Sequence, residues 1–270
     1  MAQSGEYLLG TSHGERERLL KQCEIFRPQA RWLLGKVGIQ PGWRAVDVGC
    51  GPLGIVDLLA ERVGPAGNVV GFERDPRMLE WLRASLTERN LTNVEPIQGD
   101  ASAIDLSAGS FDFVHERFVL LNVLNPERVL AEMTALVRPG GFVAVQEVDA
   151  ISWTCEPPHP AWERLLSATL TIWREGGDPC IGRRLPGLLR GAGLTDVGFN
   201  VHVPVWRPGD LYQMLLLHFV ELFREKLIAR RLLTEAELID LVQEVRSHLD
   251  DPGTIVLHWL FCQAWGRKPA

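Results

Sequence analysis

The chain has 270 residues, of which 46% are hydrophobic and 23% charged, as is usual for a globular protein. Its net charge of −6 disfavours nucleic acid as the main partner, because phosphate binding needs a concentrated positive patch. The five cysteines are odd in number and form no C-x-x-C pair, so neither a disulfide framework nor a metal site is expected.

The beginning of the chain and its apolar runs indicate neither secretion nor membrane insertion. The first residues, MAQSGEYLLG, lack a basic start followed by an apolar run, so no signal peptide is expected. The longest apolar runs, around 214–223 and 255–262, are shorter than the roughly 18 residues that span a bilayer. We therefore expect a cytoplasmic protein with neither a nucleic acid nor a membrane as its partner.

The first 149 residues combine a helical start with an alternating pattern. Residues 1–40 have a helical pattern, and from 44 to 149 short apolar runs alternate with amphipathic helical stretches. The strand-like runs are RAVDVG, GNVVGFE, NVEPIQGD, FDFVHE and GFVAVQEV, and the helical stretches are IVDLLAERVG, PRMLEWLRASLTERN and PERVLAEMTALVRPGG. This alternation predicts right-handed βαβ units and a doubly wound parallel core of five strands.

The rhythm changes after residue 150. The pattern predicts a Pro-rich loop at 151–162, helices at 161–175 and 183–192, and a strand at 196–206. A mostly helical stretch at 208–249 and a final apolar run at 254–266 follow. Two late strands would fit onto the edge of the same sheet. The helical stretch between them would then be an inserted cap.

A glycine-rich turn follows the first predicted strand. Gly49, Gly51 and Gly54 in VDVGCGPLG match the spacing G-x-G-x-x-G, and Glu73 follows at the distance that a dinucleotide site expects. However, the Asp47 carboxylate would repel a pyrophosphate, whereas it could hold an ammonium group. The chain also has no Tyr-x-x-x-Lys pair. An NAD(P)-dependent oxidoreductase is therefore the alternative, and a different cofactor is favoured.

Five segments together resemble the class I S-adenosylmethionine-dependent methyltransferases of the small-molecule type. They are VDVGCGPLG, VVGFERDPRML, VEPIQGDA, FDFVHERFVLLNV and LVRPGGFVAVQE, in the order of that family. The loop departs from the family's commonest form, because Leu53 stands in place of a third glycine and Gly54 follows it. The resemblance implies a Rossmann-like methyltransferase fold, with a mostly parallel seven-stranded sheet, and S-adenosyl-L-methionine as cofactor.

The resemblance also implies roles for the residues that contact the adenosine part. Glu73 would accept hydrogen bonds from both ribose hydroxyls, since an ionised carboxylate is a pure acceptor. Asp100 would meet the adenine amino group, with the backbone N–H of Ala101 beside it. Arg74 and Met78 would flank the adenine, although Met78 fits a core position equally well.

The methionine part would lie against the glycine-rich turn. Asp47, Gly49 and Gly51 would surround it, and Cys50 is interpreted as a small filler within the turn rather than a nucleophile. In related small-molecule enzymes an N-terminal helix often closes over the cofactor. On this basis residues 1–40 are a helical lid, with Tyr7, Gln22 and Arg27 as its candidate ligand contacts; a solvated amphipathic helix is the alternative.

Methyl transfer needs mainly alignment, because the sulfonium is already a good leaving group and a base is optional. The candidate catalytic residues are His115, Arg117 and Glu147, which follow the fourth and fifth strands. His115 could be a base, but a structural or cofactor-lining role is favoured. The expected substrate walls, each of which could equally be core, are Trp153, Trp162, Trp173, Trp206, Tyr212, Met214, His218 and Phe219.

The sequence thus predicts a methyltransferase domain over 41–270, to which 150–195 and 207–250 contribute the cap and substrate pocket. The predicted reaction is methylation of a small, aromatic or hydrophobic metabolite at oxygen, nitrogen or carbon. Besides the oxidoreductase, a non-catalytic module that binds S-adenosylmethionine is the remaining alternative. The N-terminal or cap helices could form a homo-oligomer contact.

Overall fold

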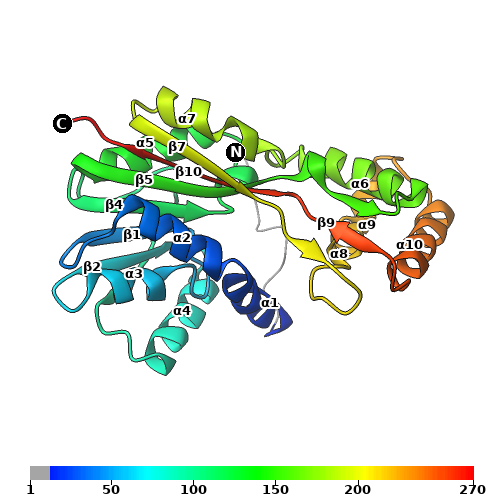
Figure 1. Ribbon diagram of the computed structural model, residues 1–270, viewed down its shortest axis with the longest axis horizontal. Coiled ribbons are helices and arrows are strands. Elements are labelled where there is room, and N and C mark those ends of the chain that lie inside the picture. Colours follow the sequence, from blue (N-terminus) through cyan, green and yellow to red (C-terminus); the bar gives the residue numbers. More distant parts are fainter. Residues whose placement is uncertain (1–12) are drawn as a thin grey trace.

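A seven-stranded, mostly parallel sheet is the centre of the computed structural model, which describes residues 13–270 (Figure 1). Strands β1 to β5 are parallel, and β10 lies antiparallel between β5 and β7, in the order β3-β2-β1-β4-β5-β10-β7. Their bounds are β1 (Arg44–Val48), β2 (Asn68–Glu73), β3 (Val94–Gln98), β4 (Phe111–Arg117), β5 (Val137–Asp149), β7 (Thr195–His202) and β10 (Leu260–Arg267). The predicted doubly wound fold with a seven-stranded sheet is confirmed.

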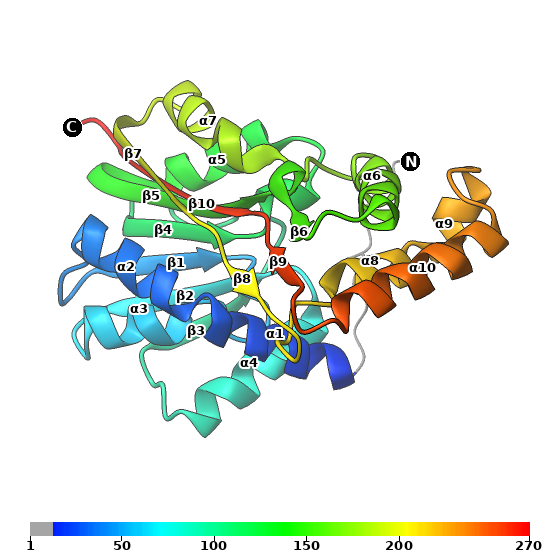
Figure 2. The same cartoon turned by 45° about the vertical axis from the view of Figure 1, so that its right-hand side comes forward.

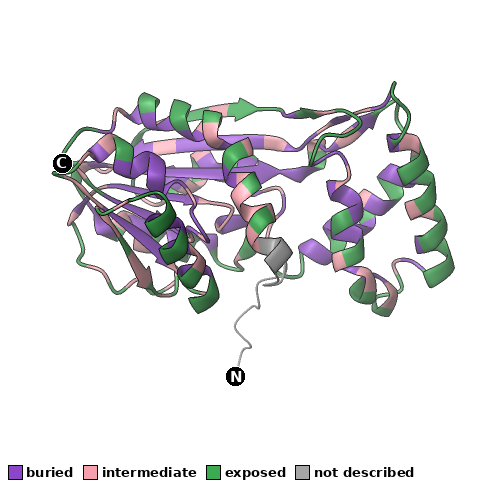
Figure 3. Ribbon diagram, turned by 90° about the horizontal axis from the view of Figure 1, so that it is seen from below, coloured by how far each residue is buried: buried purple, intermediate pink, exposed green. Residues whose placement is uncertain are grey.

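Helices cover both faces of this sheet (Figures 1 and 2). One hydrophobic core joins α2 (Arg27–Val37), α3 (Val56–Val63) and α4 (Pro76–Glu88) to the sheet. The other core joins α5 (Pro126–Leu136) and α7 (Leu185–Gly191) to the opposite face and continues into the cap. Figure 3 shows the result, with buried strands between helices that expose their outer sides.

Local sequence signals explain where the core elements begin and which way they face. Val46 belongs to one core and its neighbour Ala45 to the other, as the two-residue period of a strand requires. Helix α4 begins after Asp75, whose side chain accepts a hydrogen bond from the Arg77 N–H, and Pro76 occupies its first turn. An N-cap carboxylate followed by proline is a favourable start for a helix.

The helical start of the chain is confirmed over the described residues. It consists of α1 (His13–Ile25) followed by α2. Helix α1 lies beside the carboxyl ends of the strands, near β8 (Figure 2). Tyr7 lies outside the described residues, and the division of the chain at residue 40 stays a prediction.

The cap holds a second, three-stranded sheet that the sequence analysis did not predict. Its order is β6-β9-β8, and four helices complete the cap at one end of the molecule (Figure 1). These elements are β6 (Thr154–Glu156), α6 (Pro160–Trp173), β8 (Val205–Trp206), α8 (Leu215–Leu222), α9 (Arg224–Ala229), α10 (Glu235–Leu249) and β9 (Ile255–Leu257).

Two predicted late strands are each divided, and the predicted loop at 151–162 contains β6; these three expectations are corrected. The run at 196–206 breaks at Pro204, which has no N–H to continue the ladder, and the Pro204 carbonyl accepts a hydrogen bond from the His258 N–H instead. The final run breaks at the same level, between β9 and β10. Both runs therefore leave the main sheet together and form the second one.

Within residues 13–270, the structure contains no helix long and apolar enough to cross a membrane.

Candidate functional site

The glycine-rich turn connects β1 to α3 at the carboxyl edge of the sheet, where the strand order reverses between β1 and β4. Ligands of open α/β sheets bind at such a point. The Gly49 N–H donates to the Phe72 carbonyl at 2.7 Å, which fastens the turn to β2. Gly51 has a φ of +56°, and the side on which a Cβ would stand is open. Backbone can therefore approach a ligand closely here.

Asp47 is the buried centre of this turn. Its Oδ2 accepts a hydrogen bond from the Ile55 N–H at 2.8 Å, and its Oδ1 lies 2.7 Å from His115 Nδ1. A Cβ on Gly54 would stand 2.1 Å from Asp47 Oδ2, and Gly54 has a φ of +53°. These two facts explain why glycine occurs at position 54, while Leu53 is free to pack in the core under α3.

His115 is fully buried within a chain of polar side chains. Nδ1 faces Asp47, and Nε2 lies 3.2 Å from the Gln146 side-chain oxygen. The Asp47 carboxylate accepts from the Nδ1–H, and the Gln146 side-chain amide lies against Nε2. Both ring nitrogens are therefore occupied within the protein. The geometry favours the structural interpretation of His115, and its use as a base stays a prediction.

Glu73, at the end of β2, faces the turn across a short gap. Its Oε2 accepts from the Gly51 N–H at 3.0 Å, and its Oε1 accepts from the N–H groups of Arg74 and Asp75 at 2.7 and 2.9 Å. Burial raises the pKa of Glu73, against the effect of these hydrogen bonds. The carboxylate is thus oriented by the backbone before any ligand is present.

The other predicted cofactor residues lie nearby at the ends of β2 and β3. Asp100 is exposed, and hydrogen bonds from the Ser102 N–H and hydroxyl lower its pKa. Met78 is buried, yet it belongs to neither hydrophobic core of the described chain, which favours its ligand-side interpretation. Arg74 is exposed and Ala101 is half-buried against a core. Their predicted contacts with adenine stay predictions.

Cys50 points away from the ligand side of the turn. A Cβ on Gly71 in β2 would stand 3.2 Å from its sulfur. Burial raises its pKa well above the usual value, so the thiol is neutral. This placement agrees with the interpretation of Cys50 as a small filler.

Helix α1 approaches the turn through a residue that the sequence analysis passed over. Cys23 is buried, and its thiol faces the Gly54 backbone and Arg117; burial raises its pKa. Gln22 is half-buried beside it. Arg27 pairs with Asp57 of α3 at 2.6 Å, which ties α2 to α3, and its contact with a ligand stays a prediction. No sequence signal distinguished Cys23 from any other helix residue.

The loop after β4, residues 117–122, packs directly on the glycine-rich turn. Arg117 Nη2 donates to the Gly54 carbonyl at 3.3 Å, and its Nη1 is buried without a hydrogen-bond partner in the part of the chain that is described. A Cβ on Gly49 would stand 2.3 Å from Val119 Cγ2. Glu147 is fully buried beneath this loop and accepts from the Leu121 N–H at 3.1 Å.

Aromatic side chains gather where the cap meets the main sheet. His258 lies at the centre, and the ring centroids of Trp153, Trp206, Tyr212 and Trp259 lie 4.2 to 6.1 Å from its own. We call these five residues, with Trp173 and Phe219, the aromatic cluster. His258 and Trp259 were not among the predicted substrate walls, because an apolar run near the end of the chain is typical of a core strand.

The aromatic cluster contains polar atoms that no protein group satisfies. Within the described residues, both ring nitrogens of His258 and the indole nitrogens of Trp153, Trp173, Trp206 and Trp259 are buried and unpartnered. Burial lowers the pKa of His258 to about 3, so its imidazole is neutral at physiological pH. Buried polar groups are usually hydrogen-bonded, so these unpartnered ring nitrogens indicate a place where a ligand or water supplies the hydrogen-bond partner.

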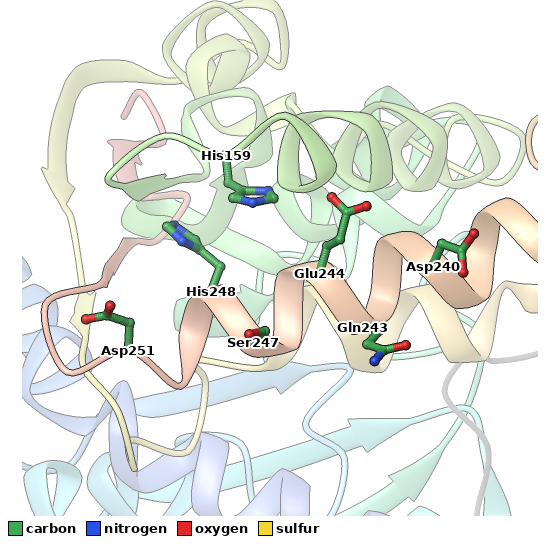
Figure 4. A pocket seen from close by; sticks show the side chains of 7 residues that line it. All are labelled: His159, Asp240, Gln243, Glu244, Ser247, His248 and Asp251. Carbon is green, nitrogen blue, oxygen red and sulfur yellow. The ribbon is translucent and has the colours of Figure 1, made fainter.

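Two hollows lie on the cap side of the molecule. The one in Figure 4 has a volume of about 620 Å³ and lies over α10 and the start of α6, where His159 and His248 face one another. It contains none of the predicted site residues. The second, of about 390 Å³, lies between α1 and β8 and reaches the aromatic cluster at Trp206. No group of three or more His, Cys, Asp or Glu side chains in residues 13–270 could hold a metal.

The strand order and the place of the turn define a Rossmann-like methyltransferase fold. Residues 45–141 match the family model described as a methyltransferase domain. This match agrees with the resemblance of the motifs to the class I S-adenosylmethionine-dependent methyltransferases, and it covers four of the five strands β1 to β5 and the start of the fifth.

The chain is also similar to named relatives in sequence and to solved structures in fold. A demethylmenaquinone methyltransferase of Listeria monocytogenes serotype 4a (strain HCC23) is 35% identical over 130 residues, which are 48% of this chain and 52% of that protein. The chain thus spans about half the length of the curated relatives it matches. Phosphoethanolamine N-methyltransferase 2 of Haemonchus contortus, solved with S-adenosyl-L-methionine, has the same fold, with a TM-score of 0.58. The two proteins are 17% identical, and the match covers 90% of this chain and 53% of that chain. The [4+2]-cyclase SpnF also shares the fold, with a TM-score of 0.50, 20% identity, and coverage of 88% and 80%.

The contact between Gly54 and Asp47 gives a first prediction. Gly54→Ala places an alanine in the left-handed backbone conformation and brings its Cβ into contact with the buried Asp47 carboxylate. It should therefore lower the free energy of unfolding by roughly 2–4 kcal/mol. Gly109→Ala is the matched control, because Gly109 has a φ of +63° with nothing within 4 Å of the added Cβ, and should lower the free energy by only about 1–2 kcal/mol. Urea unfolding of both variants measures the difference; equal losses would contradict the role given to Asp47.

Proposed function

We propose that this protein transfers a methyl group from S-adenosyl-L-methionine to a small aromatic or hydrophobic acceptor. The observation that carries the proposal is the pairing of an open glycine backbone at Gly51 with the oriented Glu73 carboxylate opposite it, within a methyltransferase domain. The family match favours this activity over the oxidoreductase alternative, and Asp47 is committed to the turn rather than to a pyrophosphate.

The cofactor residues divide by the part of the ligand they would hold. Glu73 would accept hydrogen bonds from the ribose hydroxyls, and Asp100 would accept one from the adenine amino group. The amino-acid end would lie over Gly49 and Gly51. Arg117 would donate its free Nη1 to the carboxylate there, because a buried guanidinium N–H without a partner suits an anionic oxygen.

The protein's part in the reaction would be alignment rather than proton transfer. The bound cofactor supplies an electrophilic methyl on a sulfonium, and the acceptor atom has to meet it in line. His115 has both ring nitrogens next to protein groups, and Glu147 is fully buried with Oε1 held by the Leu121 N–H. We therefore assign both residues to positioning of the surrounding loops, and Arg117 to contact with the cofactor.

The aromatic cluster is the place proposed for the acceptor. Its unsatisfied groups include four indole donors and one neutral imidazole, so it suits an uncharged ring that carries acceptor oxygens. The cluster begins at Trp153, just after β5, whose carboxyl end adjoins the cofactor edge of the sheet. The name of the curated relatives, demethylmenaquinone methyltransferase, supports a quinone-like acceptor.

A module that binds the cofactor without transferring a methyl group is the second candidate. One fold neighbour is a [4+2]-cyclase, so the fold alone does not fix the reaction. Turnover on a panel of phenols and quinols would separate the two candidates. A cytoplasmic location and a homo-oligomeric state stay predictions.

Ligand binding tests the cofactor proposal directly. Glu73→Gln should weaken S-adenosylmethionine and S-adenosylhomocysteine binding roughly ten-fold or more, because a hydrogen bond to a charged group contributes about 1.5–3 kcal/mol. Calorimetric titration measures this, with the exposed Glu80→Gln as control. Tight NAD(P)H binding without any response to the adenosyl ligands would overturn the proposal.

Arg117 gives a separate test of the amino-acid end. Arg117→Ala should weaken S-adenosylhomocysteine roughly ten-fold, while 5′-methylthioadenosine, which lacks the carboxylate, keeps its affinity. Arg83→Ala, an exposed arginine on α4, should change neither. An equal loss for both ligands would show that Arg117 acts only through the shape of the turn.

The acceptor site is tested at His258. His258→Phe keeps the ring but removes both nitrogens, so the KM for an oxygen-bearing aromatic acceptor should rise roughly ten-fold while cofactor affinity is unchanged. His202→Phe, on the exposed side of β7, is the control. A gain in thermal stability without any change in KM would place His258 in a purely structural core.

A further inference from the structure

Two buried glutamates lie side by side beneath the loop after β4. Glu116 is the second-last residue of β4 and Glu147 lies on the neighbouring strand β5, and both are fully buried. Each carboxyl group has one oxygen occupied by the loop: Glu116 Oε2 accepts from the Val119 N–H at 2.9 Å, and Glu147 Oε1 accepts from the Leu121 N–H at 3.1 Å.

The other two oxygens lack a donor in the described part of the chain. They are Glu116 Oε1 and Glu147 Oε2. The two side chains are within hydrogen-bonding reach of each other, so a single proton between them would satisfy both oxygens at once. Two adjacent carboxylates, both ionised and both buried, would instead repel strongly.

The charges around the pair give neither glutamate a counter-ion. Within residues 13–270, the Arg117 guanidinium is directed to the Gly54 carbonyl, and Arg183 pairs with Asp149. Asp47 adds a further negative charge, and His115 is bonded to it. On β10 the Cys262 thiol, paired in register with Glu147, is neutral because burial raises its pKa to about 12. A proton is therefore the remaining way to neutralise the pair.

The loop that these carboxyl groups hold has an unfavourable backbone conformation. Phe118 has a φ of +62°, which costs free energy for a residue with a side chain. Its ring contacts Phe26 at the junction of α1 and α2, and Phe261 on β10. The next residue, Val119, packs on Gly49 of the glycine-rich turn. Whatever fixes the loop therefore also fixes the edge of the proposed methyl-transfer site.

We propose that Glu116 and Glu147 share one proton, and that this pair holds residues 118–122 against the glycine-rich turn as positioning residues for the reaction. The effect on the reaction rests on the function proposed above. The shared proton itself does not, because it follows from the carboxyl groups and the loop alone.

The pair makes folding depend on pH with a defined sign. Burial raises the pKa of Glu116 to about 7, and burial together with the negative charge of Glu116 raises the pKa of Glu147 well above its usual value of 4.5. The native pair thus binds more protons than the unfolded chain. Its contribution is fully present below about pH 4.5 and is lost as the pH rises through 7 and beyond, when the last proton leaves.

Single amide substitutions test the shared proton. In Glu147→Gln the amide N–H donates permanently to Glu116, and in Glu116→Gln the roles are exchanged, so neither variant needs a proton between the side chains. The wild type should lose unfolding free energy between about pH 5 and pH 9, while both variants should be much flatter over this range. Glu127→Gln, an exposed carboxylate on α5, is the matched control and should keep the wild-type slope.

Two further readouts separate the shared proton from a merely structural role. At about pH 8, where ordinary carboxyl groups are ionised, infrared spectra of the wild type should retain a protonated carboxylic acid band that Glu147→Gln abolishes. S-adenosylhomocysteine affinity should fall roughly ten-fold in the wild type as this band disappears on further increase of pH, and should not follow pH in the variant.

The outcomes are distinguishable. A missing acid band, or an identical pH slope in wild type and Glu147→Gln, would overturn the shared proton. A band that titrates without any change in ligand affinity would overturn the positioning role. Failure of the adenosyl ligand to bind at every pH would reject the proposed function, and the stability and infrared measurements would still decide the shared proton.

Discussion

The site depends on a single buried carboxylate, Asp47, which serves two parts of the structure at once. One oxygen holds the start of α3 through the Ile55 N–H, and the other fixes the His115 ring on β4. The oxygen that accepts from Ile55, Oδ2, also occupies the space in front of position 54, so only glycine fits there. Removing an acceptor from this place would leave buried donors unsatisfied, which costs more than the hydrogen bonds themselves contribute.

Polar side chains continue inward from Asp47 along the carboxyl ends of β1, β4 and β5. His115 and Gln146 extend the chain of hydrogen bonds, and Glu116 and Glu147 receive the backbone of the next loop. A buried polar layer of this kind is favourable only when its members are all satisfied. The glycine-rich turn and the loop after β4 also touch directly, because Arg117 donates to the Gly54 carbonyl and Val119 packs against Gly49.

The sequence predicted what local patterns determine. Alternating apolar runs with intervening amphipathic helices predicted the parallel part of the sheet. The spacing of Gly49, Gly51 and Glu73 predicted a cofactor site at the edge where the structure brings Gly51 and Glu73 together. It did not predict the sheet β6-β9-β8, because its three short strands come from segments about fifty residues or more apart. Nor did it identify the neighbours of Glu147: in QEVD the glutamate looks like any polar residue at a strand end, and its partner Glu116 is brought beside it only by strand pairing.

The proposed acceptor site is likewise formed by segments that are far apart in the sequence. It lies outside the region that matches the family model. The family model ends at residue 141, whereas every member of the aromatic cluster lies between 153 and 259. The cluster is assembled from the end of β5, α6, β8, α8 and the break between β9 and β10. Similarity within the matched region therefore bears on the proposed cofactor half of the site, while the acceptor site proposed at the aromatic cluster lies outside that region. The donors left free around His258 are thus a more direct guide to the acceptor than the names of the relatives.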